Sequence, residues 1–263
     1  GRPLRDGRIS ITDRCNFRCR YCMPKEKFEK DHCFLSHTEV LSFEEIIRLG
    51  KIFAANGVEK IRLTGGEPLL RKGIEFLITE LSKLKTWNDK PLDVAVTTNG
   101  AALSAKAKSL AAAGLKRLTV SLDAMDPQIY KDLNDVNFPI EKTLAGIQAA
   151  KDAGIPSIKI NVVVKRGVNE KELIKIAEHF KGTGIIVRYI EFMDVGTSNG
   201  WRLDDVVPSL QIVEEINRVY PIEPLNPNYT GEVATRWGYK DGSGELGFIS
   251  SVSCLLYTSP SPR

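Results

Sequence analysis

The sequence has few cysteines and no long apolar segment. It holds 5 cysteines in 263 residues, whereas disulfide frameworks belong to short, cysteine-dense secreted chains. No apolar run approaches the length that crosses a bilayer, and the basic residues at the start precede no apolar h-region. We therefore expect a protein without disulfides, signal peptide or membrane anchor, located in the reducing cytoplasm.

The chain also lacks a strong excess of charge of one sign. Its formal net charge is +4, the charges are spread along the sequence, and runs of Lys and Arg with interleaved aromatics are absent. This pattern permits an anionic substrate but does not indicate nucleic-acid binding. With 42% hydrophobic and 27% charged residues, a chain of this length buries a sizeable core, which favours one large α/β domain with or without a small appendage.

Short β-branched runs alternate with longer amphipathic ones, a pattern typical of repeated βα units with a parallel sheet. Ser42 followed by Glu45 predicts a capping box at a helix start, and Ser104 is expected to precede an Ala-rich helix that Gly114 ends. We predict an α/β fold, a partial (βα)6 TIM-like barrel with parallel strands. The six expected strands are residues 8–12, 60–64, 93–98, 117–122, 158–164 and 185–191.

Three cysteines near the start, Cys15, Cys19 and Cys22, are spaced C-x3-C-x2-C. This spacing brings three thiolates onto one short loop, one too few for a closed zinc site or a fully ligated four-iron cluster. We interpret the motif as a four-iron, four-sulfur cluster with one iron left open for a small molecule. A zinc site completed by His32 or Cys33 is the alternative that the spacing alone leaves open.

The expected strands end in polar or glycine-rich sequences, and barrels of parallel strands place their active sites at these ends. In the loop at 64–68, Gly65 and Gly66 remove side chains so that backbone groups can approach a ligand, while Pro68 stiffens the exit. Together with an open-iron cluster, this loop indicates a ligand with an amino acid head group. The other such ends are residues 97–100, 121–123 and 191–194.

On these two motifs the chain resembles the radical S-adenosylmethionine (SAM) enzymes, whose signature is C-x3-C-x2-C followed by a GGE-type loop after the second strand. It further resembles the molybdenum cofactor biosynthesis protein A family, the GTP 3′,8-cyclases. The resemblance covers residues 1 to about 253, and its matching stretches lie at 1–24, 61–69, 97–100, 120–124, 159–163 and 189–196.

The resemblance implies roles for individual residues. The ligands of one [4Fe-4S] cluster, which SAM completes, would be Cys15, Cys19 and Cys22. The residues implied to contact SAM are Tyr21, Gly66, Ser121 and Met193. The residues implied to face GTP are Arg8, Arg62, Thr97 and Lys159. Cations suit a triphosphate because they give charge-assisted hydrogen bonds to phosphate oxygens. No side chain is assigned as catalytic, since the radical is generated at the cluster.

The implied reaction is a lyase step of molybdopterin biosynthesis. An electron from the cluster cleaves the sulfonium of SAM, and the resulting 5′-deoxyadenosyl radical takes a hydrogen from ribose C3′ of GTP. The ribose radical then attacks guanine C8, giving (8S)-3′,8-cyclo-7,8-dihydroguanosine 5′-triphosphate. The implied partners are GTP, a flavodoxin- or ferredoxin-like electron donor, a downstream cyclic pyranopterin monophosphate synthase and a second copy of the chain in a homodimer.

The end of the sequence departs from the family. Relatives carry a second four-iron cluster on a C-x2-C…C arrangement, whereas this chain reads Cys254 and then a stretch with alternating Ser and Pro. We expect the second cluster to be absent and cyclisation to be impaired. We assign 1–220 to the barrel, 221–253 to the start of the family's C-terminal region, a short truncated extension with a strand at 246–252, and 254–263 to a non-native or disordered tail.

Two other functions fit the sequence less well. One is another radical SAM activity, such as peptide modification, which would use the cysteine motif but would not need Arg8, Arg62 and Lys159 together. The other is a non-catalytic metal- or nucleotide-binding barrel. Formation of 5′-deoxyadenosine that depends on GTP would distinguish the cyclase from the other radical SAM activity.

Overall fold

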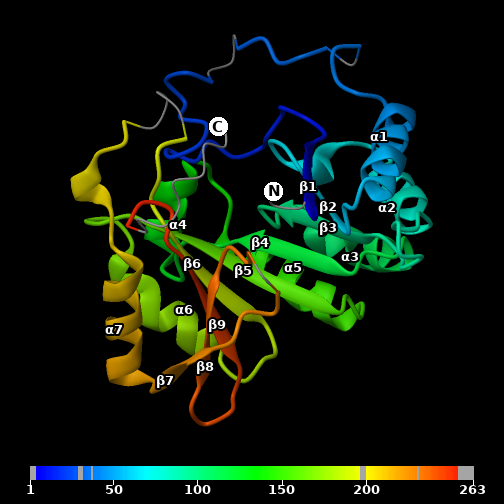
Figure 1. Cartoon of the computed structure of the whole chain (residues 1–263). Helices are drawn as coiled ribbons and strands as arrows, with labels where there is room; N and C mark the ends of the chain where they lie inside the picture. The colour runs from blue at the N-terminus through cyan, green and yellow to red at the C-terminus, as the bar shows by residue number, and fades with distance from the viewer. Residues whose placement is uncertain (1–3, 29–31, 37, 196–199, 230, 254–263) are drawn as a thin grey trace. The chain divides into compact units, whose positions relative to one another are not determined.

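The computed structural model describes residues 4–28, 32–36, 38–195, 200–229 and 231–253 (Figure 1). The chain divides into two compact units, and each is described by itself. Unit 1 comprises Gly1–Arg18, Phe28–Ser121 and Asn137–Ile158. Unit 2 comprises Cys19–Lys27, Leu122–Val136 and Lys159–Arg263.

Unit 1 is built on parallel strands in the order β1-β2-β3-β4. Its strands are β1 Asp6–Ser10, β2 Lys60–Thr64, β3 Asp93–Thr98 and β4 Arg117–Ser121. Its helices are α1 Phe43–Ala55, α2 Ile74–Ser82, α3 Leu103–Ala112 and α5 Ile140–Asp152, with a short 3-10 helix, η1 Pro68–Leu70. Each strand precedes a helix, as βα units require.

Unit 2 combines parallel strands with an antiparallel edge. Strand β6 pairs in parallel with β5 and β9, and β8 pairs antiparallel with β9 and β7. The strands are β5 Ser157–Val164, β6 Ile186–Glu191, β7 Ile222–Leu225, β8 Thr235–Tyr239 and β9 Glu245–Ile249. The helical elements are α4 Pro127–Asn134, η2 Glu170–Glu172, α6 Leu173–Phe180, η3 Leu203–Asp205 and α7 Ser209–Val219.

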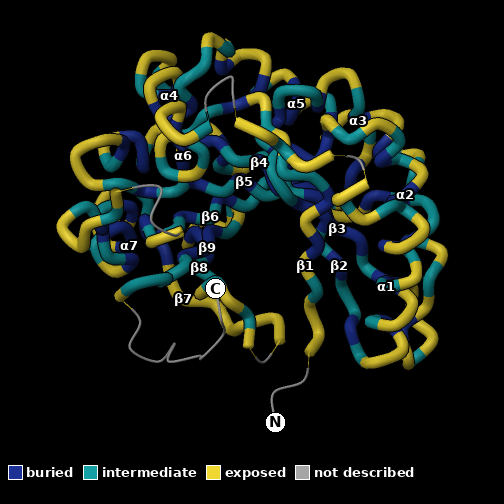
Figure 2. Tube along the Cα trace, turned by 90° about the horizontal axis from the view of Figure 1, so that it is seen from above, coloured by how far each residue is buried: buried dark blue, intermediate teal, exposed yellow. Residues whose placement is uncertain are grey.

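Buried and half-buried residues alternate along β5 and β6, and Figure 2 colours the chain by burial. On β5 the buried residues are Ile158, Ile160, Val162 and Val164, while Lys159 and Asn161 occupy the alternate positions. On β2, Ile61 and Leu63 are buried and Arg62 is half-buried. Because successive side chains of a strand point to opposite faces, one face carries the apolar core and the other presents the polar residues.

The predicted α/β class with parallel strands is confirmed, and all six expected strands form within two residues of their expected bounds. The capping box is also confirmed: Glu45 N donates to Ser42 Oγ at 3.1 Å and Ser42 N donates to Glu45 Oε2 at 2.7 Å. The expected start of α3 was wrong. Ala102 is its N-cap, without a side-chain cap, so Ser104 lies inside the helix. The hairpin of β7 and β8 was not expected, because only its proline-rich approach stands out in the sequence.

The structure tests only some of the predictions for the C-terminal part of the chain. The expected strand at 246–252 is observed as β9, which ends three residues earlier, at Ile249. The predicted division at residue 220 falls in unit 2 between α7 and β7, where it stays a prediction. Cys254 and the tail at 254–263 lie outside the described residues. Among the helices that the structure describes, none is both long and apolar enough to span a membrane.

Candidate functional site

Three of the residues predicted to face GTP come together on the strands of unit 1. Arg8 and Arg62 are register partners on β1 and β2, so their side chains lie on the same face. Arg62 Nη1 donates to Thr97 Oγ1 and to Thr119 Oγ1, both at 3.1 Å, and Arg8 Nη2 donates to Thr64 Oγ1 at 3.4 Å. Neighbouring guanidinium groups present the positive charge and planar donor geometry that suit a phosphate anion.

The glycine loop at the end of β2 packs against the start of the cysteine loop. Gly66 N donates to Thr12 O at 2.7 Å, and Glu67 N donates to Arg14 O at 2.8 Å. A Cβ atom added at Gly65 would lie 2.2 Å from Thr12 O, and one added at Gly66 would lie 2.3 Å from Arg14 O. The glycines therefore admit the protein's own backbone, a structural reason that adds to the ligand approach expected from the sequence.

Glu67 fastens the glycine loop to the end of β3. The carboxylate accepts hydrogen bonds from Leu69 N at 3.0 Å, Thr98 Oγ1 at 2.7 Å and Asn99 N at 2.7 Å. Burial raises the pKa of Glu67 above its ordinary value, although these hydrogen bonds act in the opposite sense. Asn99 in turn donates from Nδ2 to Asn16 Oδ1 at 2.9 Å, and that nitrogen lies 3.9 Å from Cys15 Sγ. The end of β3 is thus tied to the loop that carries Cys15.

None of the predicted cluster ligands forms a disulfide. Cys15 belongs to unit 1, is half-buried and accepts a hydrogen bond from Phe17 N at 3.4 Å. Cys19 and Cys22 belong to unit 2, where a turn joins them through Cys22 N donating to Cys19 O at 2.9 Å. Sulfur ligands on one short segment, none in a disulfide, suit an iron–sulfur cluster. Across the described residues, no group of three or more His, Cys, Asp or Glu side chains is already arranged as a metal site.

Tyr21, predicted to contact SAM, lies in the turn between these two cysteines. Its hydroxyl donates to Asp123 Oδ2 at 2.6 Å, and Asp123 Oδ1 accepts from Val163 N at 2.8 Å. Burial raises the pKa of Asp123 to about 6, against the lowering effect of both hydrogen bonds. Burial and then the neighbouring Asp123 carboxylate raise the pKa of Tyr21 well above its ordinary value. The Tyr21 hydroxyl therefore stays protonated and acts as a donor.

The other predicted residues lie at or near strand ends. Ser121 ends β4 in unit 1 and shares its face with Thr119 two positions earlier. In unit 2, Met193 follows β6 by two residues and Lys159 lies on β5, both half-buried. Ser121 and Gly66 lie in unit 1, whereas Tyr21 and Met193 lie in unit 2. SAM contact by these four residues stays a prediction.

Another buried carboxylate, Glu191, lies at the end of β6. It accepts hydrogen bonds from Ser209 N at 2.7 Å, from Val252 N and Ser253 N at 2.8 Å each, and from Ser253 Oγ at 2.5 Å. Burial alone would raise the pKa of Glu191, but these donors together bring it below its ordinary value. Glu191 thereby fixes the start of α7 and the segment after β9 to the same strand end.

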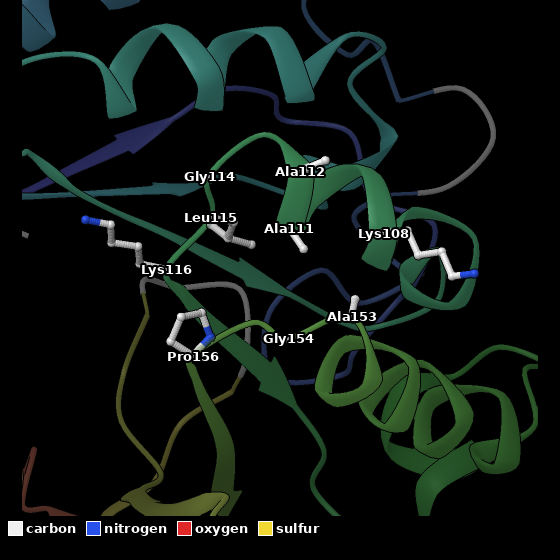
Figure 3. Close-up of a pocket in the computed structure, with 9 residues that line it drawn as sticks. All are labelled: Lys108, Ala111, Ala112, Gly114, Leu115, Lys116, Ala153, Gly154 and Pro156. Atoms are coloured by element: carbon white, nitrogen blue, oxygen red, sulfur yellow. The ribbon is translucent and has the colours of Figure 1, made fainter.

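A pocket of about 560 Å³ lies in unit 1 at the opposite, N-terminal ends of the strands (Figure 3). It is lined by the last turns of α3, by the residues just before β4 and by those between α5 and β5. The side chains of Lys108 and Lys116 point away from each other in Figure 3. The two lysine side chains of the lining therefore do not converge on one point of the pocket.

Two protein-family models match most of the chain. The model of the Radical SAM superfamily matches residues 9–180. The chain belongs to the radical SAM superfamily. A second model, Molybdenum Cofactor Synthesis C, matches residues 185–255. The radical SAM match therefore includes all three cysteines of the motif and the glycine loop.

Similarity to curated relatives identifies the family within the radical SAM superfamily. The chain is 51% identical to the GTP 3′,8-cyclase of Acidothermus cellulolyticus over 96% of its own length and 69% of the relative's. It is 49% identical to the GTP 3′,8-cyclase of Xanthomonas campestris pv. campestris and 46% identical to that of Staphylococcus epidermidis, each over 96% of this chain and 73% of the relative. This radical SAM protein therefore belongs to the GTP 3′,8-cyclase family.

Solved structures show the same fold. Streptococcus suis SuiB bound to S-adenosylmethionine superposes with a TM-score of 0.63 at 18% identity, covering 82% of this chain and 46% of that one. HydG, a maturase of the [FeFe]-hydrogenase, gives 0.61 at 17% identity, covering 84% and 51%. The chain thus spans about half the length of these structures. The likeness confirms the radical SAM fold and says nothing of substrate.

Two residues that hold predicted site residues in place, one in each unit, were not themselves predicted. Thr119 supports Arg62, and Asp123 holds Tyr21. The signal for Thr119 is its position on the polar face of β4, two residues before Ser121. The signal for Asp123 is the polar end of the expected fourth strand, in which only Ser121 received a role.

Proposed function

We propose that this chain acts as a GTP 3′,8-cyclase of molybdenum cofactor biosynthesis. Cys15, Cys19 and Cys22 bind one [4Fe-4S] cluster. The residues that contact SAM are Tyr21, Gly66, Ser121 and Met193. The residues that bind GTP are Arg8, Arg62, Thr97 and Lys159.

The observation that carries the proposal is the placement of Arg8 and Arg62 as register partners on adjacent strands, with Thr97 and Thr119 holding the second guanidinium. A fixed pair of guanidinium groups recognises phosphate oxygens with defined geometry. The GTP 3′,8-cyclases to which the chain is 46 to 51% identical support GTP as the source of those phosphates.

The chain's own residues position the substrate and the loops around the cluster. The cluster, when bound with SAM, supplies the one-electron chemistry that makes a radical. Gly65 and Gly66 bring the glycine loop against the backbone that leads into Cys15, and Glu67 holds that loop to Thr98 and Asn99. Arg8 and Arg62 hold the triphosphate so that the ribose is presented in one orientation, which lowers the entropic part of the barrier.

We further propose one cluster in the chain as given, since its 5 cysteines are too few for two sets of three. The cyclase function implies an electron donor of the flavodoxin or ferredoxin class and a downstream synthase that consumes the product. A homodimer and a cytoplasmic location complete the proposal. None of the described cysteines is in a disulfide, which supports a reducing compartment.

The cluster is tested by anaerobic reconstitution with iron and sulfide. We expect a brown protein with about four irons per chain and a paramagnetic signal after reduction. Replacement of Cys15, Cys19 or Cys22 by Ser abolishes the signal. The matched control is Cys33→Ser, an exposed thiol outside the motif, which leaves it intact. A colourless protein that takes up zinc, and loses zinc on Cys33→Ser, would contradict the cluster. About eight irons per chain would contradict a single cluster.

The substrate is tested by measuring 5′-deoxyadenosine from the reconstituted protein with and without GTP. We expect the product only when GTP is present, and a loss of GTP binding by about tenfold or more in Arg62→Met, since a charged hydrogen bond contributes about 1.5–3 kcal/mol. Arg48→Met is the matched control because Arg48 is exposed on α1. Formation of 5′-deoxyadenosine that ignores GTP would favour another radical SAM activity.

A further inference from the structure

The segment Cys19–Lys27 contains turns but no helix or strand, yet it is held firmly within unit 2. Several of its contacts go to Leu122–Val136, a segment of the same unit that we call the cradle. Arg20 N donates to Leu133 O at 3.1 Å, and Cys19 Sγ lies 3.3 Å from Asn134 Oδ1. Lys25 pairs with Asp135 at 2.7 Å, and Tyr21 binds Asp123. The cradle therefore fixes the part of the cysteine motif that carries two of its three thiols.

Asp123 of the cradle is held by several hydrogen bonds, to Tyr21, to β5 and to Asn169. Its side chain is 4% exposed, and its two carboxylate oxygens are used separately, Oδ2 for the Tyr21 hydroxyl and Oδ1 for Val163 N. Its carbonyl oxygen accepts from Asn169 Nδ2 at 2.7 Å, and the same amide nitrogen donates to Val163 O at 2.9 Å. Both the backbone and the carboxylate of Asp123 are thus fixed by β5 and the loop that follows it.

The hydrogen bond from Tyr21 to Asp123 is made by the hydroxyl group at the tip of the Tyr21 side chain. A tyrosine side chain has two rotatable angles before its ring, and a hydrogen bond at the hydroxyl fixes both. Bonds from a hydroxyl to a carboxylate are among the stronger protein hydrogen bonds. Because Tyr21 stands between Cys19 and Cys22, fixing its ring also fixes the turn on which both thiols are carried.

We propose that Asp123 is a positioning residue for SAM, acting through Tyr21. The proposal rests on the proposed function, in which Tyr21 contacts SAM, and adds a residue that holds Tyr21 in place. Asp123 does not touch SAM. It sets the direction of the Tyr21 ring before SAM arrives, so that no ordering of this turn opposes binding.

A purely structural role for Asp123 makes a different prediction. If Asp123 served only to hold β5 through Val163 N, its replacement would weaken SAM binding equally whether or not the Tyr21 hydroxyl is present. If it acts through Tyr21, the replacement has little further effect once that hydroxyl is gone. A double-mutant cycle separates the two cases. Asp123 is replaced once with the Tyr21 hydroxyl present and once without it, so the effect of losing the Val163 hydrogen bond is the same in both comparisons and cancels.

The cycle uses the reconstituted full chain and the variants Tyr21→Phe, Asp123→Ala and both together. SAM binding is measured by equilibrium dialysis and by the change that SAM causes in the paramagnetic signal of the reduced cluster, and iron content is measured beside it. We expect each single variant to weaken SAM binding by about tenfold and the double variant by little more than that, with iron content unchanged.

Asp123→Asn is the conservative control. Its amide oxygen can accept from Val163 N while its amide nitrogen donates to the Tyr21 oxygen, so SAM binding should stay within about threefold of the unsubstituted protein. If Asp123→Ala fails to fold, Asp123→Ser replaces it in the cycle, since a hydroxyl can still accept from Val163 N but is too short to serve Tyr21 as well.

The outcomes distinguish this proposal from the proposed function. Additive losses of SAM affinity in the cycle, or undiminished SAM binding in Asp123→Ala, would overturn the positioning role of Asp123. The proposed function would still be supported in that case, provided that the unsubstituted protein binds SAM. If the unsubstituted protein binds a cluster but no SAM, both fail. A double variant no weaker than Tyr21→Phe, together with recovery in Asp123→Asn, establishes Asp123 as the residue that positions Tyr21.

Discussion

The two units hold their parts of the cysteine loop by different physical means. In unit 1, backbone meets backbone: the glycine loop donates to Thr12 O and Arg14 O, and it can approach them only because Gly65 and Gly66 lack side chains. In unit 2, side chains make most of the contacts, chiefly Tyr21 with Asp123, beside one backbone hydrogen bond from Arg20 N to Leu133 O. The first arrangement is therefore sensitive to any added atom, whereas the second is sensitive to the loss of a polar atom.

The largest expected effect is steric and falls in unit 1. Gly65 has a φ of +136° and no room for a Cβ, so Gly65→Ala combines backbone strain with overlap and should lower the free energy of unfolding by about 3 kcal/mol or more. Gly154→Ala is the matched control, since Gly154 also has a positive φ of +80° but nothing within 4 Å, and should cost about 1 kcal/mol. Urea unfolding measures both. Equal losses would show that the close approach does not matter.

The next largest effect on stability is expected at Glu191, a buried carboxylate of unit 2. Glu191→Gln leaves several N–H donors facing an amide that cannot accept from all of them, and should cost about 2–3 kcal/mol near neutral pH. Because the pKa of Glu191 is lowered in the folded state, its contribution is present above the ordinary carboxyl pKa and is lost as pH falls through the folded value.

The measurement for Glu191 is urea unfolding from about pH 7 down to about pH 3, a range that brackets the ordinary glutamate pKa. The difference between the unsubstituted protein and Glu191→Gln should shrink as the pH falls. Glu141→Gln, exposed on α5, should show almost no difference at any pH. A difference that grows toward acid would contradict the stated direction.

A smaller effect is expected at Thr119 in unit 1. Thr119→Val keeps the shape but removes the acceptor of an Arg62 hydrogen bond, which contributes about 1 kcal/mol, so GTP binding should weaken by about fivefold. Thr119→Ser retains the hydroxyl and should bind GTP normally. Calorimetric titration of both variants measures the difference. Equal weakening in the two would assign the effect to packing.

The smallest effect is expected at the rim of the cradle. Lys25 pairs with Asp135, but their side chains are 53% and 26% exposed, so Lys25→Met should change the free energy of unfolding by less than about 1 kcal/mol. Lys83→Met, in a similarly exposed pair with Glu80, serves as its control. A loss of iron uptake in Lys25→Met alone would show that this ion pair contributes far more to the cysteine loop than exposed pairs usually do.

The sequence was a good guide to what is local and a poor one to what is distant. The parallel strands were predicted because their burial selects runs of Val, Ile and Leu, and the capping box at Ser42 and Glu45 spans only three positions. Asp123 was missed because its partner Tyr21 stands 102 positions away. The cap at Ala102 was missed because tertiary packing outweighed the preference of Ser104.

The same limit applies to the role of the glycines. A pair of glycines after a strand indicates a close approach, but the sequence does not say what approaches. In the structure it is the backbone at Thr12 and Arg14, more than fifty positions earlier. Arg8, Arg62 and Thr97 were brought together as expected because parallel strands in register carry such residues to one face.

The pairing of β6 with β9 has a consequence for synthesis of the chain. Val187 pairs with Leu246, about sixty residues later, so one edge of β6 has no partner strand until that stretch has left the ribosome. At about 5–20 residues per second this takes about 3 to 12 seconds. Throughout that interval the exposed edge can pair with a strand of a second nascent chain. Slower translation therefore prolongs the period in which this protein can aggregate, and the yield of folded protein should fall with it.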